Sequence, residues 1–179
     1  DMPIHIFGMA QPSESVEVVL KDSTGAIVRT GRDLAEQNGA FSVMLDPLPA
    51  TTSADQALRL EVTGANSVVV EDVLVGEVWI AGGQSNMEWP LAATGQQATE
   101  AIALCGAPTI RLIKAPHVTS NKPEWNIQAQ WATLTPETAP SFSAVALWFA
   151  LDLREALGVP VGILSINWGG TRAEPWTDL

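Results

Sequence analysis

The sequence has little of what several common classes of function require. Its 179 residues include a single cysteine, Cys105, which excludes an internal disulfide bond and a zinc site built from several cysteines. Nine lysines and arginines stand against 20 acidic residues, and the net charge of −11 repels phosphate backbones and anionic lipids. The longest apolar stretches, such as residues 144–151, are far shorter than the roughly 20 residues of a membrane-spanning helix. Nucleic acids and membranes are therefore not expected as partners.

Tryptophan is absent from the first 78 residues, whereas all seven tryptophans lie between Trp79 and Trp176. The polarity pattern changes at about the same point, which predicts two domains, residues 1–72 and 73–179. With 46% hydrophobic and 16% charged residues, the chain has enough apolar side chains to bury a core.

The first part has the pattern of a small all-β domain. Short segments of alternating polarity are separated by turn residues, such as those at 22–25 and 38–39. The expected strands cover residues 3–7, 15–20, 26–28, 40–45, 57–62 and 68–70. Short strands at this spacing predict a β-sandwich of the immunoglobulin-like or jelly-roll-like kind.

The second part alternates between strands and helices. Strands are expected at residues 76–81, 109–113 and 161–166, and the first helix at 94–104. Residues 115–139 are polar and rich in proline, which predicts a long loop. Strands separated by helices at this spacing predict a parallel sheet with helices on its faces.

The second helix of this part has the clearest pattern in the chain. Ser141 or Ser143 is expected to cap its start, and Gly158 to end it. Five apolar residues are expected on its buried face: Ala144, Val145, Leu147, Trp148 and Leu151.

Two of the predicted strands end in turns that contain a pair of glycines. Gly82-Gly83-Gln84-Ser85 follows the first of these strands, and Asn167-Trp168-Gly169-Gly170 follows the last. Reactive groups of open parallel sheets collect at the carboxyl ends of the strands. If the two strands are neighbours, the Ser85 hydroxyl and the amide of Gly169 or Gly170 converge as a nucleophile and an oxyanion donor. From spacing alone, an ordinary turn without catalytic function is the alternative.

The residues around Ser85 resemble the nucleophile block of the sialate O-acetylesterase family, within the SGNH hydrolases. The Gly-Gln-Ser-Asn-Met sequence at residues 83–87 is the specific part of this resemblance. Further segments resemble other parts of the family: residues 3–10, 75–90, 142–146, 158–163 and 168–176. The resemblance implies a β-sandwich followed by the first part of a flavodoxin-like α/β/α SGNH hydrolase domain.

The resemblance also implies a serine esterase that removes acetyl groups from sugar hydroxyls. Ser85 would be the nucleophile, with its own amide and that of Gly169 or Gly170 as oxyanion donors. Gln84 and Asn86 would support the turn through side-chain hydrogen bonds. The substrate would be an O-acetylated sugar, such as a sialic acid or a xylan, and no metal or organic cofactor would be needed.

The sequence departs from the family at the catalytic base. Family members have an Asp-x-x-His segment near the end of the hydrolase domain, and these 179 residues contain none. His5, on a predicted sandwich strand, and His117, in the long loop, are weak alternatives, because neither matches the family's base position. A serine hydroxyl needs a base. We therefore expect this chain to be the N-terminal portion of a larger esterase, inactive alone and completed by a missing C-terminal segment or by a second chain.

Four residues near the two turns are candidate contacts to the sugar: Glu88, Trp89, Arg172 and Glu174. Alternatively, Trp89 packs under the nucleophile turn, and Arg172 and Glu174 form a surface ion pair, which stabilises little. Two other functions stay open: an inactive carbohydrate-binding or spacer fragment, and a hydrolase of lipid or peptide esters. The polar, tryptophan-bearing loops favour sugars over lipids. The resemblance implies an extracytoplasmic location: secreted, periplasmic or lysosomal.

Overall fold

The chain folds into two compact units, Asp1–Val75 and Gly76–Leu179. The computed structural model describes residues 2–106, 108–122, 124 and 126–177. Each unit has its own sheets and its own cluster of buried apolar side chains. The units are therefore described one at a time.

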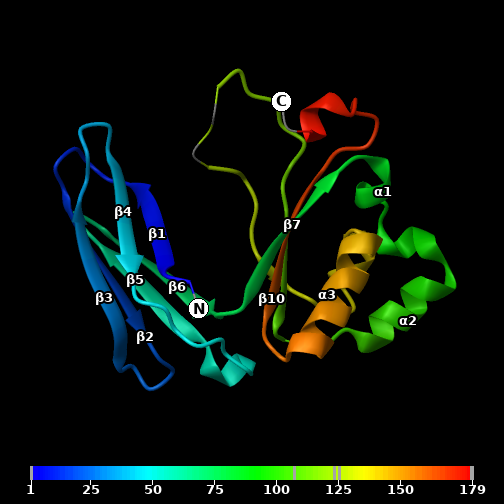
Figure 1. Cartoon of the computed structure of the whole chain (residues 1–179), viewed down its shortest axis with the longest axis horizontal. Helices are drawn as coiled ribbons and strands as arrows, with labels where there is room; N and C mark the ends of the chain where they lie inside the picture. Colours follow the sequence, from blue (N-terminus) through cyan, green and yellow to red (C-terminus); the bar gives the residue numbers. More distant parts are fainter. Residues whose placement is uncertain (1, 107, 123, 125, 178–179) are drawn as a thin grey trace. The chain divides into compact units, whose positions relative to one another are not determined.

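The first unit consists of antiparallel strands (Figure 1). One sheet pairs β1 (Ile4–Met9) with β4 (Ala40–Leu45). The other has the order β3–β2–β5–β6 and is built from the four remaining strands of the unit: β2 (Ser15–Lys21), β3 (Ile27–Leu34), β5 (Leu58–Thr63) and β6 (Ser67–Val73). A short 3-10 helix, η1 (Ala54–Gln56), precedes β5. Each segment expected to be a strand is a strand, and β3 runs further than its apolar residues indicated.

Alternating polarity positions the core of the first unit. Val16 and Val18 of β2 and Val43 and Leu45 of β4 are buried, while the residues between them are not. Side chains from both sheets join one buried cluster, which also includes Phe41. Because side chains in a strand point to alternate faces, the period of two in the sequence determines which residues enter this cluster.

The second unit contains one mixed sheet with the order β7–β10–β8–β9. The strands β7 (Glu77–Gly83), β10 (Val161–Asn167) and β8 (Ile110–Lys114) are parallel, as expected from the alternating pattern. The two-residue strand β9 (Ala132–Thr133) lies antiparallel to β8 within the segment expected to be a loop. Two residues in a polar segment have no detectable period, so β9 is not predictable from local pattern.

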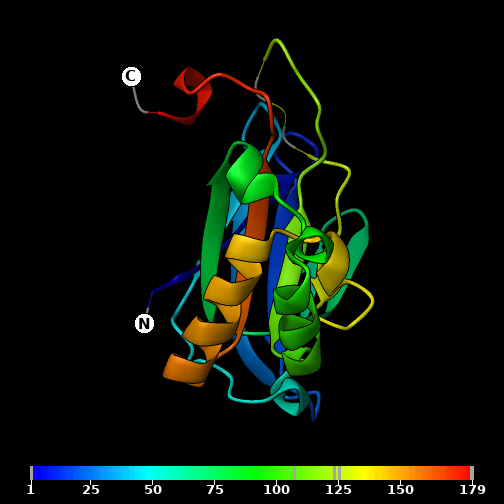
Figure 2. The same cartoon turned by 90° about the vertical axis from the view of Figure 1, so that its right-hand side faces the viewer.

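The helices of the second unit are α1 (Ser85–Glu88), α2 (Gln96–Leu104) and α3 (Ala144–Leu157). Short 3-10 helices complete the unit: η2 (Leu91–Thr94), η3 (Ala139–Ser141) and η4 (Glu174–Trp176). Figures 1 and 2 show α2 and α3 side by side on the same face of the sheet. The structure thus refines the expectation of helices on the faces of the sheet, since both long helices cover one face.

The ends of α3 follow from local sequence. The Ser143 hydroxyl accepts a hydrogen bond from the Ala146 amide at 3.2 Å, so Ser143 is the cap. Gly158 ends the helix in a left-handed conformation with φ of +66°, which glycine adopts without steric cost. The prediction that Val145 is buried is wrong, because its side chain is 54% exposed. Val145 is two residues, or about 200°, from the fully buried Leu147 and therefore points to solvent.

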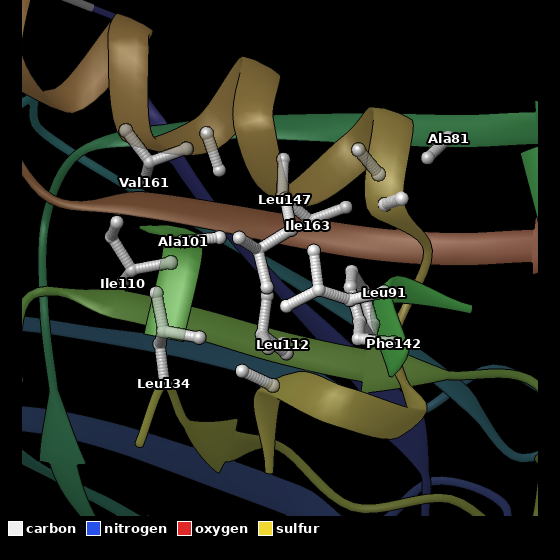
Figure 3. Close-up of a cluster of buried hydrophobic side chains, with 14 of the residues drawn as sticks. Ala81, Leu91, Ala101, Ile110, Leu112, Leu134, Phe142, Leu147, Val161 and Ile163 are labelled. Atoms are coloured by element: carbon white, nitrogen blue, oxygen red, sulfur yellow. The ribbon is translucent and has the colours of Figure 1, made fainter. Parts of the chain in front are cut away.

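A cluster of buried apolar side chains fills the space between the sheet and the two helices (Figure 3). Val161 and Ile163 of β10, Ile110 of β8 and Leu147 of α3 are fully buried in it. Cys105 packs at the margin of the cluster, and its partial burial raises the pKa of the thiol.

At the β7 edge, the opposite face of this sheet is exposed to solvent, unlike the face covered by the helices. Val78 and Ile80 of β7 pair in register with Gly162 and Leu164, so they point away from the face that contains Ile163. Their side chains are 67% and 69% exposed. β7 is also the last strand on its side of the sheet among the described residues. The apolar sequence of β7 is therefore typical of a buried strand, but its position is that of an edge strand.

Candidate active site

The carboxyl ends of β7 and β10 meet. Gly83 at the end of β7 pairs with Asn167 at the end of β10, and the Trp168 amide donates a hydrogen bond to the Gly83 carbonyl at 3.0 Å. Figure 1 shows α1 immediately after β7 at this end of the sheet. The two glycine-containing turns singled out in the sequence are thus neighbours, which is the condition for their residues to form one site.

Ser85 is the first residue of α1, and it is exposed. Gly83 has a φ of +143°, a conformation that residues with a Cβ rarely adopt, so the sharp turn into α1 depends on glycine. The Glu88 amide donates to the Gln84 carbonyl at 2.9 Å and closes the turn through the main chain. The side chains of Gln84 and Asn86 form no hydrogen bond to any described residue, and their supporting role stays a prediction.

Gly169 lies directly against Ser85. A Cβ added to Gly169 would lie 3.4 Å from Cα and 3.5 Å from Cβ of Ser85, and only 2.8 Å from Oε2 of Glu88. Gly170, next along the chain, has a φ of +78°, and an added Cβ there would meet no atom within 4 Å. The first glycine of the pair therefore permits a close approach, and the second permits the turn.

The Glu88 carboxylate joins two other parts of the site. Its Oε2 accepts a hydrogen bond from the Gly169 amide at 2.5 Å, and its Oε1 lies 3.1 Å from Nε2 of His117. The Glu88 side chain is 25% exposed. The sequence singled out Glu88 as a contact to sugar. In the structure both of its oxygens face protein groups, a role that the sequence did not reveal.

His117 follows β8 and reaches the same end of the sheet. Its Nε2 lies 2.9 Å from the Asn167 carbonyl, and its ring stacks on Trp168 with a centroid distance of 4.4 Å and an interplanar angle of 7°. Both neighbours of Nε2, the Asn167 carbonyl and the Glu88 carboxylate, are hydrogen-bond acceptors. Nε2 therefore has a proton, because a bare lone pair there would repel two oxygens.

The other candidate contacts surround the turns. Trp89 is 54% exposed, which disfavours the alternative that it packs under the nucleophile turn. Arg172 and Glu174 are both exposed after β10. The Thr171 hydroxyl orders this segment: it donates to the Trp168 carbonyl at 2.7 Å and accepts from the Trp176 indole at 2.7 Å.

Asn167 is a buried polar residue beneath the site. Its Nδ2 donates to the Ser165 hydroxyl at 2.6 Å, and its Oδ1 has no hydrogen-bond partner among the described residues. Its main-chain carbonyl binds His117 and thereby contacts the loop that follows β8.

The remaining histidine belongs to the first unit. His5 Nε2 lies 2.8 Å from the Ser42 hydroxyl, between β1 and β4. Among the described residues, no group of three or more histidine, cysteine or acidic side chains is arranged to hold a metal ion. Within the same residues, no helix is both long and apolar enough to span a bilayer.

Comparisons with known proteins give consistent relatives, although no protein-family model matches the chain. The human sialate O-acetylesterase is 26% identical over 185 residues, which cover 96% of this chain and 35% of the human protein. The mouse sialate O-acetylesterase is 27% identical over 184 residues, with 96% of this chain and 34% of the mouse protein covered. The chain thus spans about a third of the length of the curated relatives it matches.

A solved structure shows the same likeness. A carbohydrate acetylesterase from Xanthomonas citri superposes with a TM-score of 0.86 and 34% identity, over 99% of this chain and 39% of that chain. These matches show that the chain is related to carbohydrate acetylesterases. More particularly, it is homologous to sialate O-acetylesterases over nearly its whole length, which confirms the resemblance indicated by the Gly-Gln-Ser-Asn-Met sequence.

Proposed function

We propose that this chain is part of a serine esterase that removes O-acetyl groups from carbohydrates, with Ser85 as the nucleophile. The observation that supports this most directly is the exposed Ser85 at the start of α1, directly against Gly169 at the neighbouring strand end. Relatives named sialate O-acetylesterase and carbohydrate acetylesterase support the type of reaction.

The proposed reaction is a two-step acyl transfer. The Ser85 oxygen attacks the acetyl carbonyl, a base removes the hydroxyl proton, and the sugar alcohol leaves with a proton. Water then attacks the acetyl-serine and releases acetate. The Ser85 amide and one amide of the glycine pair stabilise the oxyanion, and loss of one such donor typically lowers the rate roughly 100- to 1,000-fold. No step of this chemistry uses a metal or an organic cofactor.

We propose that the catalytic base lies outside these 179 residues. In the structure, Nε2 of His117 has a proton and faces two acceptors, so that nitrogen is not available to deprotonate Ser85. We propose that an Asp-x-x-His segment outside these residues provides the base, from further chain or from a second polypeptide. The isolated chain would then be inactive or nearly so.

The sheet of the second unit supports such an addition. Val78 and Ile80 are exposed on the β7 edge strand, although parallel sheets normally have both faces covered. We propose that residues 73–179 are the first part of a flavodoxin-like SGNH hydrolase domain whose remaining strands pair with this edge. Residues 1–72 would be the small β-sandwich that precedes it.

The proposed substrate is an O-acetylated sugar such as a sialic acid or a xylan. Trp89, Arg172 and Glu174 are exposed near Ser85 or on the segment that follows the glycine pair, so they are the proposed sugar contacts. An aromatic face stacks on a sugar ring, and charged groups hydrogen-bond to its hydroxyls. An extracytoplasmic location (secreted, periplasmic or lysosomal) belongs to the same proposal.

A second candidate function is an inactive carbohydrate-binding or spacer fragment. The contacts of His117 favour this candidate, because its Nε2 faces the Asn167 carbonyl and the Glu88 carboxylate and no hydrogen bond joins it to the Ser85 hydroxyl. This candidate predicts sugar binding without reaction of Ser85 with an organophosphonate.

The test is substitution of Ser85 in the protein as its natural source produces it. We expect Ser85→Ala to abolish acetate release from an O-acetylated sugar and to abolish labelling by a fluorophosphonate, with unchanged folding by circular dichroism. Ser23→Ala, at an exposed serine in a turn of the first unit, is the matched control and should keep both activities. Acetate release that survives Ser85→Ala would refute the proposal.

A further inference from the structure

We propose that Glu88 is a positioning residue that holds the loop after β10 against the nucleophile turn. Its carboxylate binds the Gly169 amide through one oxygen and the His117 imidazole through the other. This inference rests on the proposed function, because it assigns a role within the same site.

The Glu88 carboxylate connects the carboxyl ends of three strands. Glu88 is on α1, immediately after β7; Gly169 follows β10; and His117 follows β8. A single side chain therefore links all three loops, in addition to the main-chain bond between Trp168 and Gly83 and the contacts of His117 with the end of β10. Hydrogen bonds to a carboxylate are stronger than those between neutral groups, so this contact is suited to holding a loop in place.

His117 strengthens the arrangement from the other side. Its Nε2 proton is shared between Glu88 and the Asn167 carbonyl, and its ring stacks on Trp168, the residue between Asn167 and Gly169. His117 thus contacts the end of β10 twice, through the Asn167 carbonyl and through the Trp168 ring. At the same time its Nε2 orients the Glu88 carboxylate. In this role the histidine is a structural partner of Glu88 and does not act as the base.

The hydrogen bond between Glu88 and Gly169 also distinguishes Gly169 from Gly170. The amide hydrogen of Gly169 is engaged by the Glu88 carboxylate. The Gly170 amide has no hydrogen-bond partner among the described residues, and Gly170 is exposed. Because the Gly169 amide is already hydrogen-bonded, the Gly170 amide is the oxyanion donor of the pair.

The test compares three substitutions in the full-length natural protein, with 4-nitrophenyl acetate as the substrate. Glu88→Ala removes both contacts, whereas Glu88→Gln keeps an oxygen that can accept from the Gly169 amide. We expect Glu88→Ala to lower kcat about 10- to 100-fold with little change in KM, because small misplacements of reacting groups cost rate more than affinity. Glu88→Gln should recover part of this loss, because it keeps an acceptor for the Gly169 amide but places an NH2 group against the Nε2 proton of His117. Glu100→Gln, at an exposed carboxylate of α2, is the matched control and should leave kcat unchanged.

A second measurement separates positioning from general destabilisation. In protein labelled with ¹⁵N-glycine, the amide proton of Gly169 should resonate far downfield, shift upfield in Glu88→Ala and return towards its original position in Glu88→Gln. An unchanged Gly169 resonance and unchanged kcat in Glu88→Ala would overturn the proposal. A rise in kcat would overturn it as well, because it would show that the carboxylate blocks the site.

Together with the activity of Ser85→Ala, the kcat and the Gly169 resonance of Glu88→Ala distinguish this inference from the esterase proposal. If Ser85→Ala stays active while the Gly169 resonance still depends on Glu88, the esterase assignment fails and the loop contact stands. If Ser85→Ala is inactive and Glu88→Ala is indistinguishable from the unaltered protein in both measurements, only the role of Glu88 fails.

Discussion

The neighbouring strands β10 and β7 have similar apolar sequences but different surroundings. Five of the seven residues of β10 are buried, whereas only Ala81 of β7 is buried. β10 has a hydrogen-bonded strand on each side, and β7 has one only on the side of β10. The comparison shows that an apolar run specifies a strand, but that its burial depends on elements that lie beside it.

The same contrast occurs in the first unit. The central strand β2 buries Val16, Val18 and Leu20, whereas Val68, Val69 and Val70 of the edge strand β6 are 44–53% exposed. The valine-rich sequence of β6 is as apolar as that of β2. Position in the sheet, and not composition, decides which valines contribute to the core.

The largest predicted effect contrasts Ile163 with Ile80. Ile163→Ala should lower the free energy of unfolding of the second unit by about 2–5 kcal/mol, because Ile163 is fully buried and the change leaves a cavity. Ile80→Ala should lower it by about 0.5 kcal/mol or less, since that side chain is 69% exposed.

Urea unfolding followed by tryptophan fluorescence measures both values, because all seven tryptophans lie in the second unit. Equal losses for the two variants would contradict the comparison. A large loss for Ile80→Ala alone would show that the β7 edge is covered in solution.

Local signals explain how much of this fold the sequence predicts. The strands β2 and β4 follow from a period of two, and the ends of α3 follow from Ser143 and Gly158 within a few residues. The prediction for Val145 is wrong, because an apolar residue on an amphipathic helix does not reveal where the buried face is centred. The exposure of β7 could not be predicted either, since it depends on the strand order.

The candidate site likewise has a part that local sequence predicts and a part that depends on the strand order. The glycine-containing turns and Ser85 were recognisable, because each is a short motif at the end of a strand. The bond between Glu88 and Gly169 joins residues 81 positions apart, and the bond between His117 and Asn167 joins residues 50 apart. No local pattern encodes such pairs, and only the side-by-side placement of β7, β10 and β8 brings them together.

A smaller effect is predicted at the start of α3, the helix that covers β10. Ser143→Ala should lower the free energy of unfolding by about 1 kcal/mol, because the Ala146 amide loses its acceptor. Ser141→Ala is the matched control: Ser141 is exposed, and its hydroxyl only donates to the Thr138 carbonyl. The same fluorescence experiment compares them. A larger loss at Ser141 would show that the helix begins earlier than the structure indicates.

The smallest effect concerns the turn between the central strand β2 and the edge strand β3. Asp22 accepts hydrogen bonds from the Thr24 hydroxyl and from the amides of Thr24 and Ala26. These bonds lower the pKa of Asp22 in the folded chain, with the Thr24 hydroxyl as the largest cause.

Because the folded pKa lies below the unfolded one, the carboxylate stabilises the fold above the unfolded pKa, near 4. This contribution decreases as the pH falls through the folded pKa. Asp22→Asn should therefore reduce the difference in stability of the first unit between pH 6 and pH 3, measured from the exchange of its backbone amides by NMR. Because Asp22 is only partly buried, the change should be small. Adding Thr24→Ala to Asp22→Asn should cause no further change in the pH dependence, since the carboxylate that Thr24 stabilises is already absent. An undiminished pH dependence in Asp22→Asn would show that other carboxylates, such as Glu14 or Glu61, dominate the acid response of this unit.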